Sequence, residues 1–364
     1  METRIVFHID FDYFYAQCEE TRAPELKSKP VCVCVFSDRG GDSGAIATAN
    51  YTARKYGVKS GLPIAFAKKR LEERKDAVFL PVDFDFYSEI SEKAMEVMKE
   101  NADIFEYVGR DEAYLDVTER IEGNFEKASH LAQQIKNSIR DKIKLSCSIG
   151  VSPNKLISKI ASDFQKPDGL TIVSPEKVET FLEPLKIRTI PGIGKKTEEK
   201  FSEMKLETIQ DLKKIDIFTL NKFFGRKTGA YIHNAARGID NESVKEREAR
   251  IQYSKITTLK KDSKDYEFLS ENVLELCKEV YEVVKKNNQT FKSVGIHFVQ
   301  SDLSNKSKSR MLRNPTSGIE ELEKTAEQLL KEALENQTIT IRRLGVKVSE
   351  LSDVQGQSDI TSYF

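Results

Sequence analysis

Cysteine and histidine are scarce in this chain. Among its 364 residues are five cysteines and four histidines, and no two cysteines form a CxxC pair. Zinc sites and disulfide frameworks need such residues at close spacing, so the sequence predicts reduced core cysteines and no zinc. Apolar runs near the roughly 18 residues of a membrane-spanning helix are missing, as is a signal-peptide pattern. We therefore expect a soluble, cytoplasmic protein with no membrane partner.

An excess of charge of one sign is also missing. The sequence balances 58 basic residues against 58 acidic ones. The field of the whole molecule therefore gives no indication of a nucleic-acid partner, and any such surface must come from local segregation of charge. The length is sufficient for about two to four domains with cores of their own.

The first candidate site lies where two strands are predicted to meet. Alternating apolar side chains predict a strand over residues 4–11, with Asp10 near its end. Residues 105–118 have the pattern of a hairpin, and Asp111 and Glu112 lie at its turn. If these strands are neighbours, three carboxylates converge and repel one another unless cations neutralise them. Oxygen ligands suit Mg²⁺, and two Mg²⁺ ions about 4 Å apart support in-line phosphoryl transfer.

Cationic side chains follow in two further segments. Tyr51 and Arg54 are three residues apart, so on a helix they share a face and would bind a polyphosphate together. They belong to an insert rich in alanine and glycine, residues 20–80, which we expect to form a small subdomain. A row of lysines over residues 155–166 adjoins the next predicted strand, where a triphosphate would need countercharge.

Ordinary structural roles compete with these interpretations. Asp10, Asp111 and Glu112 are residue types that also form turns and cap helices. Tyr51 and Arg54 would equally make a half-buried ring beside an exposed cation, and a lysine row is most often a solvated helix face. The spacing alone leaves both interpretations open.

The order of predicted elements indicates an α+β fold. A strand, a helix, the insert, another helix, the hairpin, a further helix and a final strand follow one another up to residue 151. This order fits a ferredoxin-like split βαβ sheet with helices on one face, which would leave the other face open for chemistry.

The next segment, residues 170–237, is predicted to be helical and contains a short glycine motif. Gly192 and Gly194 precede Lys195 and would present bare backbone N–H groups at a helix N-terminus. This arrangement is typical of a helix-hairpin-helix, which binds DNA phosphates without reading sequence. Residues 238–249 are charged and lack apolar periodicity, so we interpret them as a linker.

Beyond residue 250, charge separates by element type. The strand-like segments carry most of the basic residues, among them Lys255, Arg310, Arg342 and Arg343. The helical segments carry most of the acidic ones. This pattern predicts a sheet with one basic face, backed by two acidic helices, that binds DNA phosphates.

Together the motifs resemble those of Y-family, lesion-bypass DNA polymerases of the archaeal DNA polymerase IV (DinB) type. They are Asp10-Phe11-Asp12-Tyr13-Phe14-Tyr15, Ala47-Thr48-Ala49-Asn50-Tyr51-x-Ala53-Arg54, Asp111-Glu112-Ala113-Tyr114-Leu115-Asp116, Asn154-Lys155-x₃-Lys159, Lys166-Pro167 and Pro191-Gly192-Ile193-Gly194. The likeness covers residues 1–349. It implies a palm (1–19 and 81–168), fingers (20–80), a thumb (169–237), a linker (238–249), a little finger with a four-stranded sheet (250–349) and a flexible tail (350–364).

The resemblance also implies roles for individual residues. Asp10, Asp111 and Glu112 would hold two Mg²⁺ ions, with the backbone oxygen of Phe11 as a further ligand. Lys159 would lie near the primer terminus, and Tyr15 would exclude a ribose 2′-OH. The expected nucleotide-binding residues are Tyr13, Tyr15, Thr48, Tyr51, Arg54 and Lys166. The expected DNA-binding residues are Gly192, Gly194, Lys195, Lys255, Arg310, Arg342 and Arg343.

Two residues depart from the family pattern. The family usually has Ser-Ile before the Asp-Glu pair, whereas this chain has Gly109 and Arg110. Glycine has no hydroxyl to accept the proton of the primer 3′-OH, so we expect that proton to leave through water or a substrate phosphate. Arg110 stands at a position expected to be apolar, and we expect it to turn outward or to pair with an acid.

The C-terminus contains a short apolar motif in a polar tail. Ile360, Tyr363 and Phe364 would share one side of a helical turn, and Gln357 precedes them by one turn. This pattern resembles the box by which polymerases bind the sliding clamp PCNA. The alternative is that the two aromatic rings fold back on the little finger.

The function predicted from these motifs is template-directed addition of dNTPs to a primer, across damaged bases. Small alanine- and glycine-rich fingers would press weakly on the nascent pair, so we expect low fidelity, and no segment suggests proofreading. We expect a monomer. A nucleotidyl cyclase with a similar palm and an inactive DNA-binding scaffold are the competing classes; neither needs all of these motifs together.

Overall fold

The computed structural model describes residues 4–246, 250–335 and 339–354. Contacts divide the chain into two units, one formed by Met1–Val35 with Ala45–Arg247 and the other by Phe36–Gly44 with Glu248–Phe364. In the described part of the chain, no helix is both long and apolar enough to cross a membrane. All five cysteines are buried and unpaired, as the sequence predicts.

The first unit is built on a mixed sheet with strand order β5-β6-β1-β7-β8. Its neighbouring strands are antiparallel except for β7 and β8. The strands are β1 (Val6–Phe11), β5 (Ile104–Tyr107), β6 (Glu112–Asp116), β7 (Cys147–Ser152) and β8 (Leu170–Ile172). The predicted strand at the N-terminus and the hairpin are confirmed. The expectation that residues 170–237 are helical is wrong at β8, which extends the sheet.

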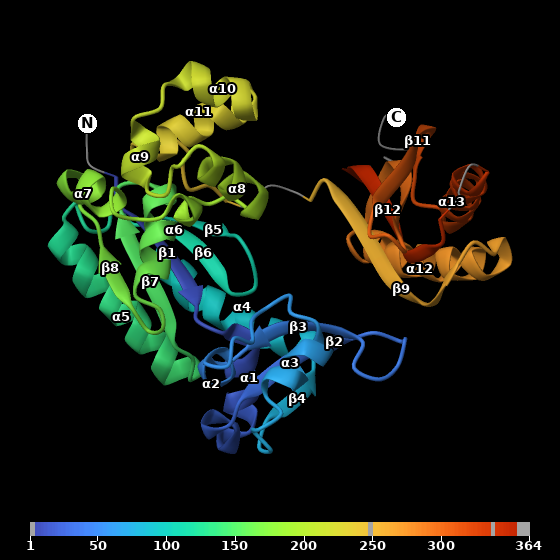
Figure 1. Cartoon of the computed structure of the whole chain (residues 1–364), viewed down its shortest axis with the longest axis horizontal. Coiled ribbons are helices and arrows are strands. Elements are labelled where there is room, and N and C mark those ends of the chain that lie inside the picture. Colours follow the sequence, from blue (N-terminus) through green and yellow to red (C-terminus); the bar gives the residue numbers. More distant parts are fainter. Residues whose placement is uncertain (1–3, 247–249, 336–338, 355–364) are drawn as a thin grey trace, which may run out of the picture. The chain divides into compact units, whose positions relative to one another are not determined.

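Helices α4 (Phe84–Glu100) and α5 (Phe125–Ile143) pack on one face of this sheet (Figure 1). Phe7, Ile9 and Phe11 on β1, and Ile5 just before it, alternate and point into that core, where each is at most 2% exposed. This alternation is why a period of two in the sequence predicted the strand correctly.

The opposite face of the sheet is not as open as the sequence suggests. Helix α6 (Lys155–Phe164) packs against β1 and β7 there. Gly150 on β7 makes this possible, because a Cβ at this position would lie 1.9 Å from the backbone oxygen of Ser158. Only glycine allows so close an approach, and helical periodicity in α6 could not reveal which face it would cover.

The insert forms a small sheet of its own, with order β3-β2-β4. Its elements are β2 (Val31–Phe36), β3 (Gly44–Ala49), β4 (Val78–Pro81), α2 (Tyr51–Arg54) and α3 (Ile64–Arg70), preceded by α1 (Phe14–Arg22). Small side chains such as Cys32, Cys34, Ala49 and Ala53 share its core with a few larger aliphatic ones. The insert thus has a small core of its own, as the sequence predicts for a subdomain.

Short helices follow β8. They are α7 (Val178–Leu182), α8 (Lys195–Glu203), α9 (Ile209–Lys213), α10 (Ile217–Phe224) and α11 (Arg226–Ala235), together with 3₁₀ turns at Pro175–Lys177 and Ile187–Thr189; another 3₁₀ turn, Pro24–Ser28, follows α1. Their apolar residues share a core with α6. The helical bundle therefore continues directly from the helix that covers the sheet.

The segment interpreted as a linker is in contact with this first unit over much of its length. Val244 is 2% exposed and packs with Val6 and Tyr114. The Asp240 carboxylate accepts a hydrogen bond from the Leu156 backbone N–H at the start of α6 (2.9 Å). Two bulky apolar residues, Ile239 and Val244, in a charged stretch show no periodicity, and for this reason the contact of Val244 was not predicted.

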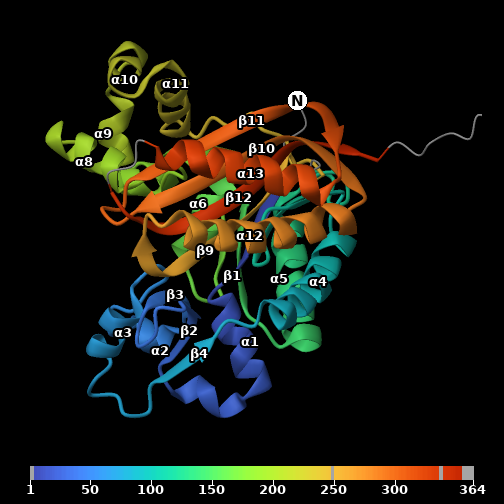
Figure 2. The same ribbon diagram turned by 90° about the vertical axis from the view of Figure 1, so that its right-hand side faces the viewer.

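The second unit contains a sheet with order β11-β10-β12-β9, four strands within its described residues. The elements are β9 (Gln252–Ser263), α12 (Tyr266–Lys286), β10 (Gln289–Gln300), β11 (Asn305–Thr316), α13 (Ile319–Leu334) and β12 (Ile341–Asp353). Both helices lie on one face of the sheet (Figure 2) and share its apolar core. Strand β12 continues to Asp353, opposite Gln289, so regular structure extends beyond residue 349, where the sequence pattern ends.

Candidate active site

The two central strands place the predicted carboxylates next to each other. Asp10 on β1 stands directly opposite Glu112 on β6 in the antiparallel register. The Phe11 backbone N–H donates to the Asp111 carbonyl oxygen at 2.9 Å, so Asp111 is held at the end of the same strand pair. Side chains opposite each other on one face of a sheet are close neighbours. The convergence expected from the sequence is therefore present.

A buried histidine, which the sequence analysis missed, completes this cluster. His8 lies two residues before Asp10 on the same face of β1 and is 0% exposed. Its Nδ1 is 2.7 Å from Ser162 Oγ and its Nε2 is 3.2 Å from Glu112 Oε2. One ligand atom from each of His8, Asp10 and Glu112 lies within 4.8 Å of the others. The spacing of two residues between His8 and Asp10 on a predicted strand could have shown that both side chains lie on the same face.

Two lysines from α6 and the turn after it neutralise the carboxylates. Lys159 Nζ contacts Glu112 Oε2. Lys166 Nζ lies 2.6 Å from Asp10 Oδ1 and 2.8 Å from Asp163 Oδ1. Both ammonium groups thus occupy oxygen atoms that a metal ion would also use.

Burial and these partners move the pKa values in different directions. Burial raises the pKa of Asp10 to about 6, although Lys166 opposes the change. The hydrogen bond from His8, helped by Lys159, lowers the pKa of Glu112 to about 2. Burial lowers the pKa of His8 to about 4. A neutral His8 and an ionised Glu112, the latter also paired with Lys159, agree with both values.

The donor set is suited to a hard divalent cation. Burial and the neighbouring Glu112 charge raise the pKa of Asp111, so a cation beside it would stabilise its ionised form. Carboxylate oxygens are the preferred ligands of Mg²⁺. The residues therefore fit a metal ion, with His8 as a neighbour that orients Glu112.

The predicted triphosphate residues also gather near this point. The Arg54 guanidinium lies over the Tyr51 ring, 4.8 Å from its centroid, and Tyr13 meets Tyr51 edge to face at 5.4 Å. Burial raises the pKa of Tyr51, and the charges of Asp12, Arg54 and Lys166 also act on its hydroxyl. Tyr51 on α2 of the insert and the carboxylate cluster are thus within electrostatic reach of each other. Thr48 lies on β3 in the same subdomain.

Tyr15 on α1 belongs to an aromatic cluster of the first unit. Its ring stacks on Tyr87 at 4.7 Å, and Phe84 approaches it edge-on at 6.0 Å. Tyr87 is fully buried and its hydroxyl donates to Glu19 at 2.7 Å. Because Tyr87 is fixed in this way, the position of the Tyr15 ring is fixed as well.

A buried polar network supports the turn that carries Lys166. Lys136 on α5 is 4% exposed and donates to the carbonyl oxygens of Cys147, Asp168 and Gly169. Asp12 accepts from the Asp168 backbone N–H at 2.9 Å and from Ser146 Oγ at 2.7 Å. The sequence analysis gave Lys136 no role. A lysine within the apolar stripe of its helix was the signal, because such a cation needs buried acceptors.

The glycine motif has the geometry expected of a phosphate-binding turn. Gly192 has φ +81°, which other residues rarely adopt, and Gly194 caps the N-terminus of α8. The Tyr231 hydroxyl donates to the Pro191 carbonyl at 2.7 Å and so holds the turn against α11. Gly194 and Lys195 are both exposed. The turn therefore presents backbone N–H groups at an accessible helix N-terminus.

The basic residues of the second unit do not all share one face of the sheet. Arg310 and Lys255 pair across the strands with Val294 and Val346, which belong to the core under the helices. Arg310 contacts Glu332 on α13, and Lys255 lies 3.3 Å from Glu279 on α12. The prediction of a single basic face is wrong for these two residues. Each stands directly opposite a core residue on the neighbouring strand, so its side chain lies on the face of the sheet that the helices cover.

The open face of that sheet carries a different set. Arg343 and Lys347 alternate with core residues on β12, and both charges act on His297 of β10. Burial, followed by these cations, lowers the pKa of His297. Its ring covers Gly345, where a Cβ would lie 2.1 Å from the ring. Arg342 adjoins a register shift of β12 and is half-buried.

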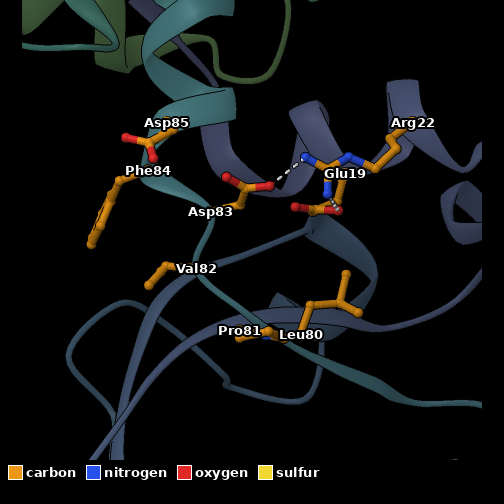
Figure 3. Close-up of a pocket in the computed structure, with 8 residues that line it drawn as sticks. All are labelled: Glu19, Arg22, Leu80, Pro81, Val82, Asp83, Phe84 and Asp85. Carbon is orange, nitrogen blue, oxygen red and sulfur yellow. Dashed lines mark hydrogen bonds and ion pairs between the residues drawn. The ribbon is translucent and has the colours of Figure 1, made fainter.

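A pocket of about 570 Å³ lies where α1 meets the start of α4 (Figure 3). Arg22 pairs with Asp83 at 2.8 Å and lies 3.9 Å from Glu19. Phe84 and Asp85 line the pocket as well. With three carboxylates and one arginine, the pocket does not have the chemistry of a triphosphate site.

Comparisons with known proteins agree with this geometry. Models of the impB/mucB/samB family match residues 9–163, and those of its C-terminal domain match residues 250–361. A thumb-domain model named for DNA polymerase-iota matches residues 188–240. DNA polymerase IV of Nitrosopumilus maritimus (strain SCM1) is 82% identical over 100% of both chains. The chain belongs to the Y-family of lesion-bypass DNA polymerases.

More distant relatives and solved structures support the same family. DNA polymerase IV of Methanosarcina acetivorans is 41% identical over 100% of both chains. A chimeric Y-family DNA polymerase has a TM-score of 0.90 at 35% identity, over 96% of this chain and 100% of that one. The insertion ternary complex of Dbh DNA polymerase has a TM-score of 0.69 at 35% identity, with the same coverage. As a Y-family member the chain is a metal-dependent, DNA-directed DNA polymerase of the translesion type.

The predicted clamp motif (Gln357, Ile360, Tyr363 and Phe364) lies outside the described residues. Gly109, in contrast, is described, and a Cβ there would lie 3.4 Å from Asp111 Oδ1 and 3.7 Å from Glu112 Cγ. These are ordinary contacts, so a serine would fit. Lack of space therefore does not explain why this chain has Gly109 where the family usually has serine.

Proposed function

We propose that this Y-family polymerase adds dNTPs to a primer 3′ end with two Mg²⁺ ions, held by Asp10, Asp111, Glu112 and the Phe11 carbonyl oxygen. The observation that carries the proposal is the cross-strand pair of Asp10 and Glu112, already neutralised by two lysines. Bound there, Mg²⁺ would polarise the reacting phosphate and lower the pKa of the primer hydroxyl. With Gly109 at the hairpin, the proton would leave through water or a substrate phosphate.

The lysines would change partners during the reaction. Lys166 now neutralises Asp10, and in our proposal it contacts the triphosphate together with Arg54 and Tyr51. Tyr13 and Thr48 belong to the same nucleotide-binding group. Lys159 would act near the primer terminus, beside Glu112. The buried contacts of Lys136 would keep the turn of Lys166 in place during this exchange.

Tyr15 would select the sugar. Its ring is held by Tyr87 and Phe84, so it has little freedom to move away from a ribose 2′-OH. Rejection by a fixed ring is a matter of volume, and it discriminates ribonucleotides from deoxynucleotides without any polar contact.

DNA would be held through phosphates by both units. Gly192, Gly194 and Lys195 would bind one strand at the N-terminus of α8. In the second unit we assign the leading contact to Arg343, with Arg342 beside it, while Lys255 and Arg310 contribute less because acidic residues already pair with them. We keep the division into palm, fingers, thumb, linker, little finger and tail proposed from the sequence, except that the little finger extends to Asp353 with β12.

We also propose that Gln357, Ile360, Tyr363 and Phe364 bind the sliding clamp PCNA, on the strength of the sequence motif alone. Deleting residues 357–364 is expected to spare extension without clamp and to remove stimulation by clamp. Equal PCNA affinity of the truncated and full-length chains in calorimetry would contradict this assignment. A monomeric state and a cytoplasmic location likewise stay predictions.

Primer extension tests the proposed function. With Mg²⁺ and a primer–template, the chain is expected to add the dNTP complementary to the template base and to stop without a template. A cyclase would instead release pyrophosphate without a primer, and an inactive scaffold would bind DNA but add nothing. Either result would contradict the proposal.

A further inference from the structure

Arg110, the residue that replaces an apolar side chain of the family pattern, turns outward beside the active site. It directly precedes Asp111 and its side chain is exposed. Its Nε donates to Ser88 Oγ at 3.1 Å, and Ser91 Oγ donates to its carbonyl oxygen at 2.7 Å. These two hydrogen bonds to α4 fix the Arg110 backbone and the Nε end of its guanidinium group.

The charged end of Arg110 has no carboxylate partner within the described residues. Its guanidinium carbon instead lies 5.2 Å from the centroid of the Phe84 ring. Phe84 is 42% exposed, although its side chain is large and apolar. An exposed guanidinium held against an exposed aromatic ring is a common surface for contacts with nucleic acid.

The position of Phe84 indicates which part of the DNA Arg110 would reach. Phe84 stands between Arg110 and Tyr15, whose ring it meets edge-on. On the fingers side, Tyr13 meets Tyr51, which lies against Arg54, in the group that would hold the triphosphate. If Tyr15 lies under the sugar of the incoming nucleotide, Arg110 lies on the side away from the triphosphate, beside the primer-terminal pair.

We propose that Arg110 donates hydrogen bonds to minor-groove acceptors of the primer-terminal base pair. The inference rests on the proposed function, because it requires Tyr15 to lie under the incoming sugar. Purine N3 and pyrimidine O2 are acceptors that the minor groove offers in every sequence. A guanidinium aimed at them would grip any correctly paired terminus and would lose its acceptor when a mismatch displaces the base edge. Arg110 would thus restore some selectivity for matched primer ends.

Replacing the acceptor and the donor separately tests this contact. Single-turnover extension is measured from a primer ending in deoxyadenosine and from one ending in 3-deaza-deoxyadenosine, which lacks N3. For the wild type we expect the analogue to lower kcat/KM on the order of tenfold, as for loss of a charge-assisted hydrogen bond. For Arg110→Ile we expect a similar loss on the normal primer and no further loss with the analogue, because both changes remove one interaction.

Matched controls separate this contact from charge and from folding. Lys93→Met removes one exposed charge elsewhere on α4 and is expected to keep the full penalty for the analogue. Arg110→Lys keeps the charge but loses the fork of donors, so it should show part of the penalty. The thermal midpoint and the Kd for DNA are measured for every variant to exclude unfolding as a cause.

Two outcomes would overturn the inference. One is an equal penalty for the analogue in the wild type and in Arg110→Ile. The other is no penalty for the analogue in the wild type. If Arg110→Ile then also weakens DNA binding and lowers the salt slope of log Kd by about one, Arg110 contacts a backbone phosphate instead. If the wild type extends neither primer, the proposed function itself fails, and this result is distinct from both.

Discussion

The lysines near the carboxylate cluster of the first unit and the cations on the open face of the second unit's sheet meet opposite surroundings. In the first unit Lys155, Lys159 and Lys166 are each paired with a carboxylate, and their side chains are at most 29% exposed. On the open face of the second unit, Arg343 has no ionic partner among the described residues and is exposed. Paired, half-buried cations hold a geometry, whereas exposed unpaired ones attract phosphates without fixing a position. The first arrangement suits chemistry and the second suits binding.

The largest effect is expected from removing a carboxylate of the first unit. Glu112→Ala and Asp111→Ala should each lower nucleotide addition by on the order of a thousandfold or more, since the metal would lose a ligand. The Kd for DNA should change little, because the proposed phosphate contacts are assigned to α8 and to the second unit. Single-turnover extension and fluorescence anisotropy measure the two quantities. If either variant adds nucleotides at a rate within tenfold of the wild type, the paired site of the first unit is not the site of chemistry.

Lys166→Met tests the paired cations next. We expect kcat/KM for the dNTP to fall by about a hundredfold, because a charge-assisted contact to the triphosphate is lost. DNA affinity should stay within about threefold, in keeping with one screened charge. If nucleotide use and DNA affinity fell by the same factor, Lys166 would belong to a generic basic surface instead.

The pH dependence of stability sharpens the picture of the paired site. The pKa of Asp10 is about 6 in the folded protein against an ordinary value of 3.8. The folded form therefore binds a proton between these values that the unfolded form does not, and stability rises as the pH falls. In metal-free protein, we expect the wild type to gain about 1 kcal/mol over Asp10→Asn between pH 7.5 and 5.

Urea unfolding at the two pH values measures this difference. His8 is present in both proteins, so its own titration, which lowers stability as the pH falls, cancels in the comparison. A stability difference that does not change with pH, or one that changes in the opposite direction, would show that burial does not control Asp10.

The smallest effect is expected in the second unit, from a matched pair of arginines. Arg343→Ala should weaken DNA binding about threefold to tenfold and lower the salt slope of log Kd by about one, as for one lost phosphate contact. Arg310→Ala should have less effect, because Glu332 already neutralises Arg310. Equal effects of the two substitutions would mean that the pairing with α13 does not survive in the complex.

The sequence predicted the carboxylate pair because local rules were sufficient there. Period-two alternation defined β1 and the hairpin, and antiparallel pairing then brought Asp10 opposite Glu112. Tyr51 and Arg54 followed from helical spacing in the same way. Short-range patterns and a single strand pairing were therefore sufficient to predict that Asp10 lies beside Glu112 and that Tyr51 lies beside Arg54.

Contacts between elements distant in sequence were not predicted. His8 reaches Ser162 only because Gly150 lets α6 pack closely on the sheet, and Lys136 finds its acceptors in a turn more than thirty residues away. Val244 is buried by residues from two strands. Such partners depend on which faces meet, and composition and periodicity do not determine that.

The central claim is that Lys166 holds Asp10 in the place of a metal ion. Titration of free Mn²⁺, followed by electron paramagnetic resonance without DNA or nucleotide, tests it directly. Lys166→Met should bind Mn²⁺ a few-fold more tightly than the wild type, because a competing cation is gone, while Lys93→Met should match the wild type. Equal or weaker binding by Lys166→Met would contradict the account.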